Sequence, residues 1–368
     1  MMRWSTAATW ALLILLIIGS TWGAPNRLTS KDFTAEELAK MPPEELAKLV
    51  PSYILNHFTP EQLANLTPDE LSHLIPTKFQ KREFPKIKYK ITVKIKKIPS
   101  YDKIANMSAT ELMNLPVAVE ADVYLSPDGR ITKVKIKKAD YSILSTSTVV
   151  VYSPHPDDET FGAGGRMRYY KNLGYNVGVV LFTRGEMSNV YNDILDENGW
   201  SEEEFTRDDF ANARLREFLA AKSRLGYDWY VDVQEPDGQL WSYTVTTWVQ
   251  SMEAMLNVVK HIAAQDDSWH PDHEATAIGL RDANVPSYKK MWYRVYYYGS
   301  YDYKYNLPSS IHYVKKNALY EYKYRDTNPD PKTGRFGIAY RSTPNIWQYF
   351  YDNSVEYFDY RYKNIVGG

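Results

Sequence analysis

The fold is decided by the stretch Val149-Val150-Val151-Tyr152-Ser153-Pro154-His155-Pro156-Asp157-Asp158-Glu159. Its apolar, β-branched first half is typical of a buried parallel strand. The strand ends abruptly in polar residues, and a helical pattern at Arg166–Leu173 follows a group of three glycines between residues 162 and 165. His155 and the carboxylates therefore lie where a strand turns into a helix, which is the usual ligand position in an open α/β sheet.

Strands and helices alternate after this stretch. Val177–Phe182 and Trp229–Val233 read as short buried strands, and Phe210–Leu225 between them reads as a helix that stops at Gly226. This order predicts an α/β fold, a Rossmann-like parallel sheet with helices on both faces. The glycines at 162–165 do not make a G-x-G-x-x-G pattern, so no dinucleotide is implied.

A second polar cluster, His270-Pro271-Asp272-His273, follows about a hundred residues later. The chain has only seven histidines, and three of them lie in these two clusters, which we therefore expect to meet in space. Cysteine is absent, which excludes thiolate metal sites, cysteine nucleophiles and disulfides. The formal net charge of −1 over 368 residues argues against a general polyanion binder, so we expect no nucleic-acid partner.

Residues 1–24 have the pattern of a secretory signal peptide. Arg3 precedes the apolar run Ala7–Ile18, and small residues follow it. An uncleaved N-terminal anchor is the alternative, because Trp22 and Pro25 make the cleavage site imperfect. In either case we expect an extracytoplasmic protein, secreted or anchored at the outer face of the cell membrane, with no other membrane contact.

Residues 25–80 contain short helical repeats. Phe33–Ala39 returns as Phe58–Ala64, and Ser/Thr residues with capping-box spacing begin several of the copies. These helices could form a spacer or a docking surface. We favour a small helical array that packs on the rest of the protein, because its leucine stripes need a partner surface.

Residues 81–145 are predicted to form a small antiparallel β-sheet. Apolar and lysine residues alternate from Lys86 to Ile95, and the strand patterns Val117–Leu125 and Ile131–Ile136 flank a turn signal. The lysines could hold an acidic polymer, but lysines of this kind more often solvate a sheet and protect its edges. Residues 146–368 then form the remaining, α/β domain.

The motifs after residue 148 resemble the PIG-L/LmbE-like family of metal-dependent N-acetylglucosamine deacetylases. The resemblance covers about residues 148–285, with a fainter echo at Lys315–Tyr322. The motifs that carry it are His155-Pro156-Asp157-Asp158-Glu159, Thr183-x-Gly185-Glu186, Arg214-x-x-Glu217 with Leu225-Gly226, Pro236-Asp237-Gly238, and His270-Pro271-Asp272-His273.

The resemblance implies that His155, Asp158 and His273 bind the metal and that Asp157 is the general base. It also implies that His270 assists the oxyanion or the leaving group. The chemistry agrees, since two imidazoles, one carboxylate and an open position make a catalytic zinc site, although another divalent metal is possible. The alternatives are that Asp157 and Asp158 only cap the following helix and that the later histidines lie on the surface.

Three further positions are less defined. The resemblance suggests that Arg214 contacts substrate, although helical arginines more often form salt bridges. Trp269 precedes the second cluster, so we predict that it lines a groove with tyrosines from 296–305, and Ser188–Asp209 could form a wall or lid. Arg184 stands where the family often has Asp, and the strand before the second cluster is marked only by His261–Ala264.

The sequence thus predicts a zinc-dependent hydrolase that removes the N-acetyl group from an N-acetylglucosamine-type sugar or glycoconjugate. A catalytically silent carbohydrate-binding protein on the same scaffold is the alternative. Retention of Asp157 and of all three predicted ligands favours the enzyme.

Overall fold

The computed structural model describes residues 90–105, 107–126, 129–266, 270–297 and 300–363, which lie in one compact unit, Lys88–Val366. The predicted signal or anchor segment (1–24), the predicted helical repeats (25–80) and Trp269 lie outside these residues and stay predictions. No helix within the described ranges combines the length and the apolar character needed to cross a membrane.

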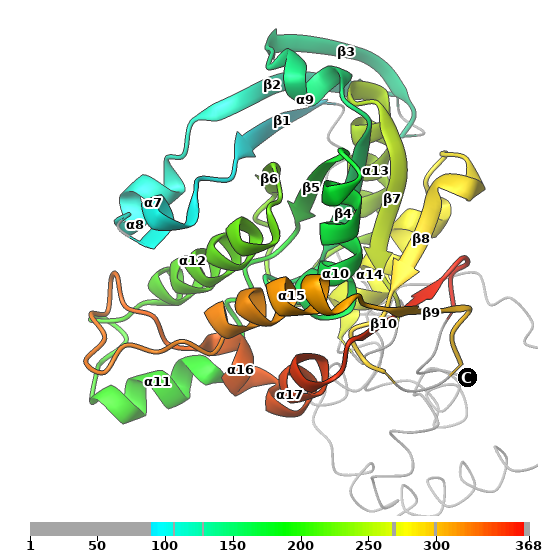
Figure 1. Cartoon of the computed structure of the whole chain (residues 1–368). Helices are drawn as coiled ribbons and strands as arrows, with labels where there is room; N and C mark the ends of the chain where they lie inside the picture. Colours follow the sequence, from blue (N-terminus) through cyan, green and yellow to red (C-terminus); the bar gives the residue numbers. More distant parts are fainter. Residues whose placement is uncertain (1–89, 106, 127–128, 267–269, 298–299, 364–368) are drawn as a thin grey trace, which may run out of the picture. The chain divides into compact units, whose positions relative to one another are not determined.

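Five parallel strands form the centre of a mixed α/β structure, in the order β6-β5-β4-β7-β8 (Figure 1). β4 is the strand expected from the opening stretch, and it lies in the middle of the five. In chain order the strands are arranged 3-2-1-4-5, as in doubly wound folds. Their bounds are β4 Thr148–Ser153, β5 Asn176–Leu181, β6 Trp229–Asp232, β7 Val258–Ala264 and β8 Lys290–Tyr293.

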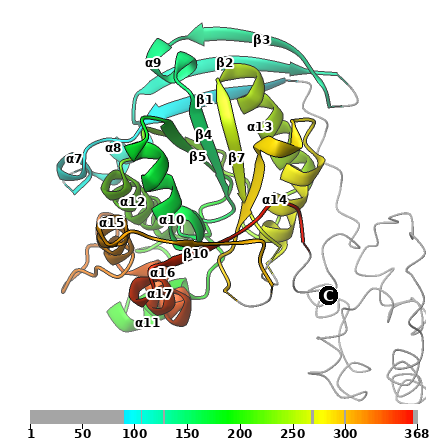
Figure 2. The same ribbon diagram turned by 45° about the vertical axis from the view of Figure 1, so that its right-hand side comes forward.

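Helices cover both faces of this sheet, as predicted (Figure 2). One face is packed by α10, α12 and the later helix α15, and the opposite face by α13 and α14. The strand side chains alternate accordingly, since Val149 and Val151 enter the first core while Val150 and Tyr152 enter the second. The bounds are α10 Asp158–Asn172, α11 Val190–Asn198, α12 Arg207–Leu225, α13 Ser242–Met255, α14 Pro271–Asp282 and α15 Ser309–Glu321.

Helix α10 begins at Asp158, so the prediction of a helix only from Arg166 was wrong about its start. The glycines read as an interruption lie inside the helix, because they allow close packing. A Cβ atom on Gly162 would lie 2.5 Å from the carbonyl oxygen of Arg294. Glycine is therefore required here by the approach of another backbone.

The antiparallel strands before residue 146 continue the same sheet, whereas the sequence predicted a separate small one. Lys96 and Lys97 of β1 pair with Tyr230 and Trp229 of β6. This edge of the sheet is extended in the order β3-β2-β1. Its elements are β1 Lys90–Lys97, α7 Tyr101–Ala105, α8 Ala109–Met113, β2 Val117–Leu125, β3 Ile131–Lys138 and α9 Tyr141–Ser145. The domain boundary predicted between residues 145 and 146 stays a prediction.

The tyrosine-rich C-terminal part completes the other edge of the sheet. Strand β10 pairs antiparallel with β8 and with β9, which brings the sheet to ten strands within the described residues. The helices of this part pack near α10, as the contact of α15 with α10 and α12 shows (Figures 1 and 2). The remaining elements are η2 Ser287–Lys289, β9 Tyr303–Asn306, α16 Ile338–Ser342, α17 Pro344–Asp352 and β10 Val355–Asp359.

Candidate metal centre

The two polar clusters meet at the carboxyl ends of β4 and β7. These strands are parallel neighbours. β7 pairs with both β4 and β8, with one register shift near Val258, although its sequence marks it poorly. The chain leaves β4 for β5 on one side and later returns to β7 on the other. The site therefore lies at a topological switch point, where open α/β sheets bind ligands.

His155, Asp158 and His273 form one buried group, as predicted. Asp158 Oδ2 lies 3.0 Å from His155 Nδ1 and 3.2 Å from His273 Nε2. The three donor atoms lie within 4.8 Å of one another. Zinc bonds of about 2.0–2.2 Å would place tetrahedral ligands about 3.3–3.6 Å apart, so this donor set fits a divalent metal. His273 is only 3 % exposed, which excludes the alternative that it is a surface residue.

Asp157 is held by Arg214. Asp157 occupies the N-cap position of α10, but its side chain makes no capping hydrogen bond, so the capping alternative fails for this residue. Instead, Arg214 Nη2 donates to Asp157 Oδ2 at 3.2 Å, and Arg214 Nη1 donates to the Gly185 carbonyl at 2.8 Å. A Cβ atom on Gly185 would lie 1.8 Å from the guanidinium, and its φ of 64° also favours glycine.

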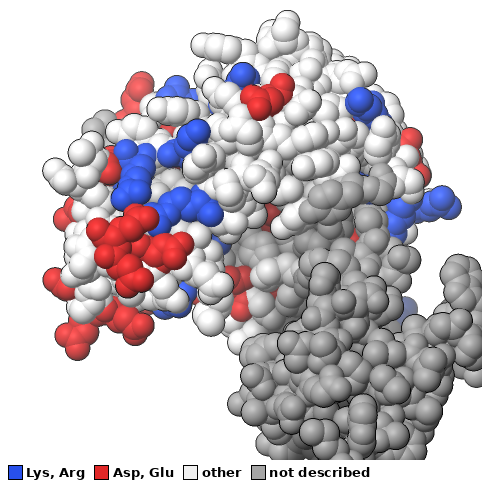
Figure 3. Space-filling model, turned by 90° about the horizontal axis from the view of Figure 1, so that it is seen from below, with Lys and Arg blue, Asp and Glu red and all other residues white. Residues whose placement is uncertain are grey.

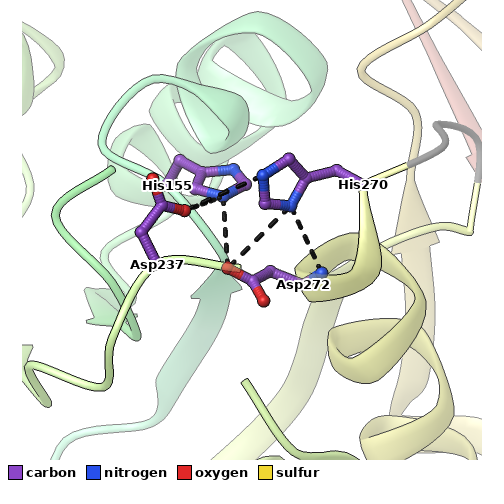
Figure 4. A group of neighbouring side chains, drawn as sticks. All are labelled: His155, Asp237, His270 and Asp272. Carbon is purple, nitrogen blue, oxygen red and sulfur yellow. Dashed lines mark hydrogen bonds and ion pairs between the residues drawn. The ribbon is translucent and has the colours of Figure 1, made fainter. Parts of the chain in front are cut away.

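The opposite edge of the His155 ring faces a second group of side chains. His155 Nε2 lies 3.2 Å from Asp237 Oδ1 and 3.5 Å from Asp272 Oδ2. The His270 ring stands edge-on to His155, with 4.3 Å between centroids. Figure 4 shows these four side chains pointing toward one another from the loop after β4, the loop after β6 and the start of α14.

Asp237 and Asp272 also hold the surrounding backbone. Asp272 accepts hydrogen bonds from the amides of Gly238 and Leu240, which fixes the loop after β6 against α14. Asp237 Oδ2 accepts from the Met187 amide. The sequence motifs contained both residues, but the prediction gave them no role. The available signal was the position of Asp272 between His270 and His273, and the place of Asp237 in the motif Pro236-Asp237-Gly238.

Burial and neighbouring charges act in opposite directions on the pKa values of this site. Burial raises the pKa of Asp157, and the nearby Arg214 partly opposes this. Burial would also raise the pKa of Asp158, but the two histidines beside it hold that pKa well below its usual range. The surrounding protein and His155 lower the pKa of His270. His270 is therefore neutral near pH 7, although 40 % of its side chain is exposed.

A buried network supports the turn that carries the ligands. Glu159 contacts Lys222 of α12, and both side chains are fully buried. Lys222 donates to Thr160, and Ser153 Oγ lies 2.7 Å from Glu159 Oε2. The hydroxyl of Tyr322, at the end of α15, donates to the Pro156 carbonyl. Lys222 and Tyr322 were missed by sequence reasoning.

The predicted aromatic groove is only partly represented in the described residues. The Tyr296 ring lies 6.5 Å from the His273 ring, between centroids. Tyr297 stacks on Tyr349 at 3.7 Å, so that face of the ring is already covered by protein. The connection predicted as a wall or lid contains α11, and its Trp200 packs against a small core that includes Phe336. The groove stays a prediction.

Arg184 is neutralised by its surroundings. Its guanidinium bonds both carboxylate oxygens of Asp232, at 3.3 and 2.5 Å, and also Asn212 Oδ1 at 3.1 Å.

On the side that carries α11, Figure 3 shows acidic and basic side chains close together. Glu197 of α11, for example, pairs with Arg325 and Arg341. Neither sign of charge dominates this part of the described surface.

Three comparisons relate the chain to known proteins. Residues 150–284 match the family model described as PIG-L: GlcNAc-PI de-N-acetylase, which is a deacetylase family. No curated protein matches the sequence significantly.

Several solved structures resemble the fold. The conserved protein TT1542 from Thermus thermophilus is 20% identical over 57% of this chain and 93% of its own, with a TM-score of 0.40. N,N'-diacetylchitobiose deacetylase from Pyrococcus horikoshii is 16% identical over 58% and 83%, with a TM-score of 0.42. The 4-carboxy-2-hydroxymuconate hydratase GalB from Pseudomonas putida is 16% identical over 55% and 82%, with a TM-score of 0.39.

Proposed function

We propose that this chain, whose residues 150–284 are a PIG-L domain, is a zinc-dependent deacetylase that hydrolyses the N-acetyl amide of an N-acetylglucosamine-type sugar. One observation carries the proposal. A carboxylate free of any capping role, Asp157, lies beside a buried donor set of two imidazoles and one carboxylate. A binding protein without catalysis would have no need for this carboxylate.

His155, Asp158 and His273 would hold the metal, which would polarise the amide carbonyl and acidify a water molecule. Asp157 takes the proton from that water as it attacks the carbonyl carbon. Arg214 orients the Asp157 carboxylate and partly opposes the rise of its pKa, because its guanidinium lies 3.2 Å away. Arg214 is thus a positioning residue, and the direct substrate contact suggested by the resemblance stays a prediction.

His270 is placed to stabilise the negative oxygen that develops on the substrate. Its ring is neutral near pH 7 because its pKa is lowered, and a neutral imidazole keeps one N–H to donate. The partial exposure of His270 agrees with a role at the solvent side of the site. Transfer of the Asp157 proton to the departing nitrogen then releases the free amine and acetate.

The assay for this proposal is acetate release from N-acetylglucosamine and its oligomers up to the tetramer, with and without a metal chelator. We expect release that the chelator abolishes and that added zinc restores. Binding of the oligomers without release of acetate would instead support the carbohydrate-binding alternative. Faster hydrolysis of longer oligomers, lost in Trp269→Ala, would support the predicted aromatic groove.

The proposed substrate is an N-acetylated sugar outside the cytoplasm. The N-terminal signal or anchor pattern supports this location, and the family description supports an amino-sugar amide. Cell fractionation with an antibody against the folded unit tests the location. Recovery in the cytoplasm of the native cell would contradict it.

A further inference from the structure

We propose a second divalent-cation site, formed by His155 Nε2, Asp237, Asp272 and His270, next to the group that contains Asp158 and His273. The two sites would share the His155 ring, one on each ring nitrogen. The ligand class is a borderline divalent ion such as zinc or cobalt, because the donors are two imidazoles and two carboxylates.

The distances between donors support this site. His155 Nε2 lies 3.2 Å from Asp237 Oδ1 and 3.5 Å from Asp272 Oδ2, close to the tetrahedral spacing of about 3.3–3.6 Å. His270 completes the group, with Nε2 3.8 Å from Asp237 Oδ1. One donor atom from each of the four residues lies within 4.8 Å of the others. Figure 4 shows them directed at a common centre.

Two buried atoms point to a missing ligand. His155 Nε2 and Asp237 Oδ1 lie 3.2 Å apart, but neither atom has a hydrogen bond of regular geometry within the described part of the chain. Their residues are 8 % and 7 % exposed. A buried acceptor and ring nitrogen this close without hydrogen-bond alignment cost free energy unless a third centre satisfies both. A cation between them and Asp272 would do so.

The charge of the site favours more than one cation. Four carboxylates, Asp157, Asp158, Asp237 and Asp272, face one guanidinium, that of Arg214, so carboxylates are in excess. One divalent ion in the first site leaves Asp237 and Asp272 outside its ligand set. Buried charge of one sign is costly, so the residual negative charge attracts a further cation.

Simultaneous occupation of both sites has a chemical requirement. A neutral imidazole carries a lone pair on only one ring nitrogen, so binding at Nε2 while Nδ1 is also occupied releases the ring proton to solvent. The second ion should therefore bind more weakly than the first. Since it engages His270, it should also inhibit the proposed deacetylase when zinc is in excess, a consequence that rests on the proposed function.

The test is metal titration of the full chain, stripped of metal and supplied with zinc or cobalt alone. Calorimetry and elemental analysis should give two ions per chain, the second at least tenfold weaker. Asp237→Asn and Asp272→Asn should each bind one ion instead of two, because Asn lacks the charge that holds the second. His273→Gln is the matched control, because it should weaken the tight ion and leave a weak one.

Each other outcome overturns the proposal. A wild-type chain that binds one ion has a single site, and Asp237 then only orients His155. Two ions in wild type and also in both Asp variants would place the second ion elsewhere. Circular dichroism checks that the variants fold, and His270→Gln serves as a third variant if either Asp variant fails. Because the readout is stoichiometry, the result stands even if the chain releases no acetate.

Discussion

Two lysines are buried against helix α10, one at its first turn and one at its middle. Lys222 contacts Glu159 at the first turn, and Lys315 Nζ lies 2.6 Å from Glu356 Oε1 beside the middle. All four side chains are fully buried. Lys315 also donates to the Phe161 carbonyl, while Glu356 accepts from the amide of Gly165. Both pairs thus compensate their desolvation with additional hydrogen bonds.

The difference between the pairs lies in what they hold. The Lys222 pair, with Tyr322, reaches the residues between the candidate ligands, whereas the Lys315 pair reaches only helix backbone within α10. A buried lysine–glutamate pair therefore supports the geometry of the site at Lys222 and the packing of the helix at Lys315. This comparison shows that a buried ion pair near a site has to be judged by the backbone to which it is connected.

The largest effect is expected at the turn itself. His155→Ala removes a ligand of the candidate metal site, so the purified variant should lose most bound metal and activity together. Elemental analysis and acetate release measure the two quantities. Metal content equal to wild type would show that the turn does not form the metal site.

Asp157→Asn tests the same turn without removing a ligand. The amide keeps the shape of the side chain but cannot accept a proton, so turnover should fall by roughly 10²–10⁴-fold while metal remains bound. Turnover near that of wild type would show that another residue is the base.

The two lysines are compared directly by Lys222→Met and Lys315→Met. Removal of one partner of a buried pair should lower the free energy of unfolding by about 3–5 kcal/mol in both variants. Only Lys222→Met should also weaken metal binding, by about 10–100-fold, as loss of outer support around a metal does.

Metal affinity is measured on the folded fraction of each variant, and chemical denaturation gives the stability. Tyr322→Phe is the milder variant, since it deletes only the hydroxyl that donates to the Pro156 carbonyl. Equal metal affinity in Lys222→Met, Lys315→Met and wild type would remove the distinction between the two pairs.

The smallest effect is expected at Glu217. This buried carboxylate contrasts with Glu159 and Glu356, because it accepts a hydrogen bond from the Ile338 amide and has no buried lysine partner among the described residues. Burial raises its pKa from 4.5 to about 7. Its folded pKa lies above its unfolded pKa, so its contribution to stability is complete below about pH 4.5 and is lost as pH rises toward 7. The change is about 3 kcal/mol by proton linkage.

Glu217→Gln should therefore flatten the dependence of unfolding free energy on pH between about 4.5 and 7. Denaturation of wild type and variant at four pH values in this window measures the effect. Parallel curves for the two proteins would show that Glu217 does not titrate in this range.

Local patterns made the centre of the sheet predictable, and they identified the three side chains that form the candidate ligand set. The strand before His155 and the helix that ends at Leu225 have strong periodicity and a clear stop, and both occur as expected. The predicted start of α10 was wrong because glycine is a weak helix former. Only the close approach of the Arg294 backbone explains why Gly162 lies inside the helix.

Contacts between residues far apart in the sequence could not be predicted from local patterns. The pairing of β1 with β6 joins Lys97 to Trp229, and nothing local encodes that register. Lys222 did carry a signal, since it lies on the apolar face of α12 with Phe218 and Leu225, at helical spacing. A lysine at such a position needs a buried acceptor, but the sequence does not identify Glu159 as that acceptor.

The hydroxyl of Tyr322 sets an order of events during biosynthesis. The candidate ligands His155, Asp158 and His273 all precede α15, so a growing chain contains every one of them before Tyr322 has been added. Contacts between residues far apart in sequence form late, because chain entropy must first be lost. The Pro156 carbonyl therefore receives its hydrogen bond only after α15 has docked, and a ribosome-bound chain that ends before α15 would hold metal in an unfinished turn.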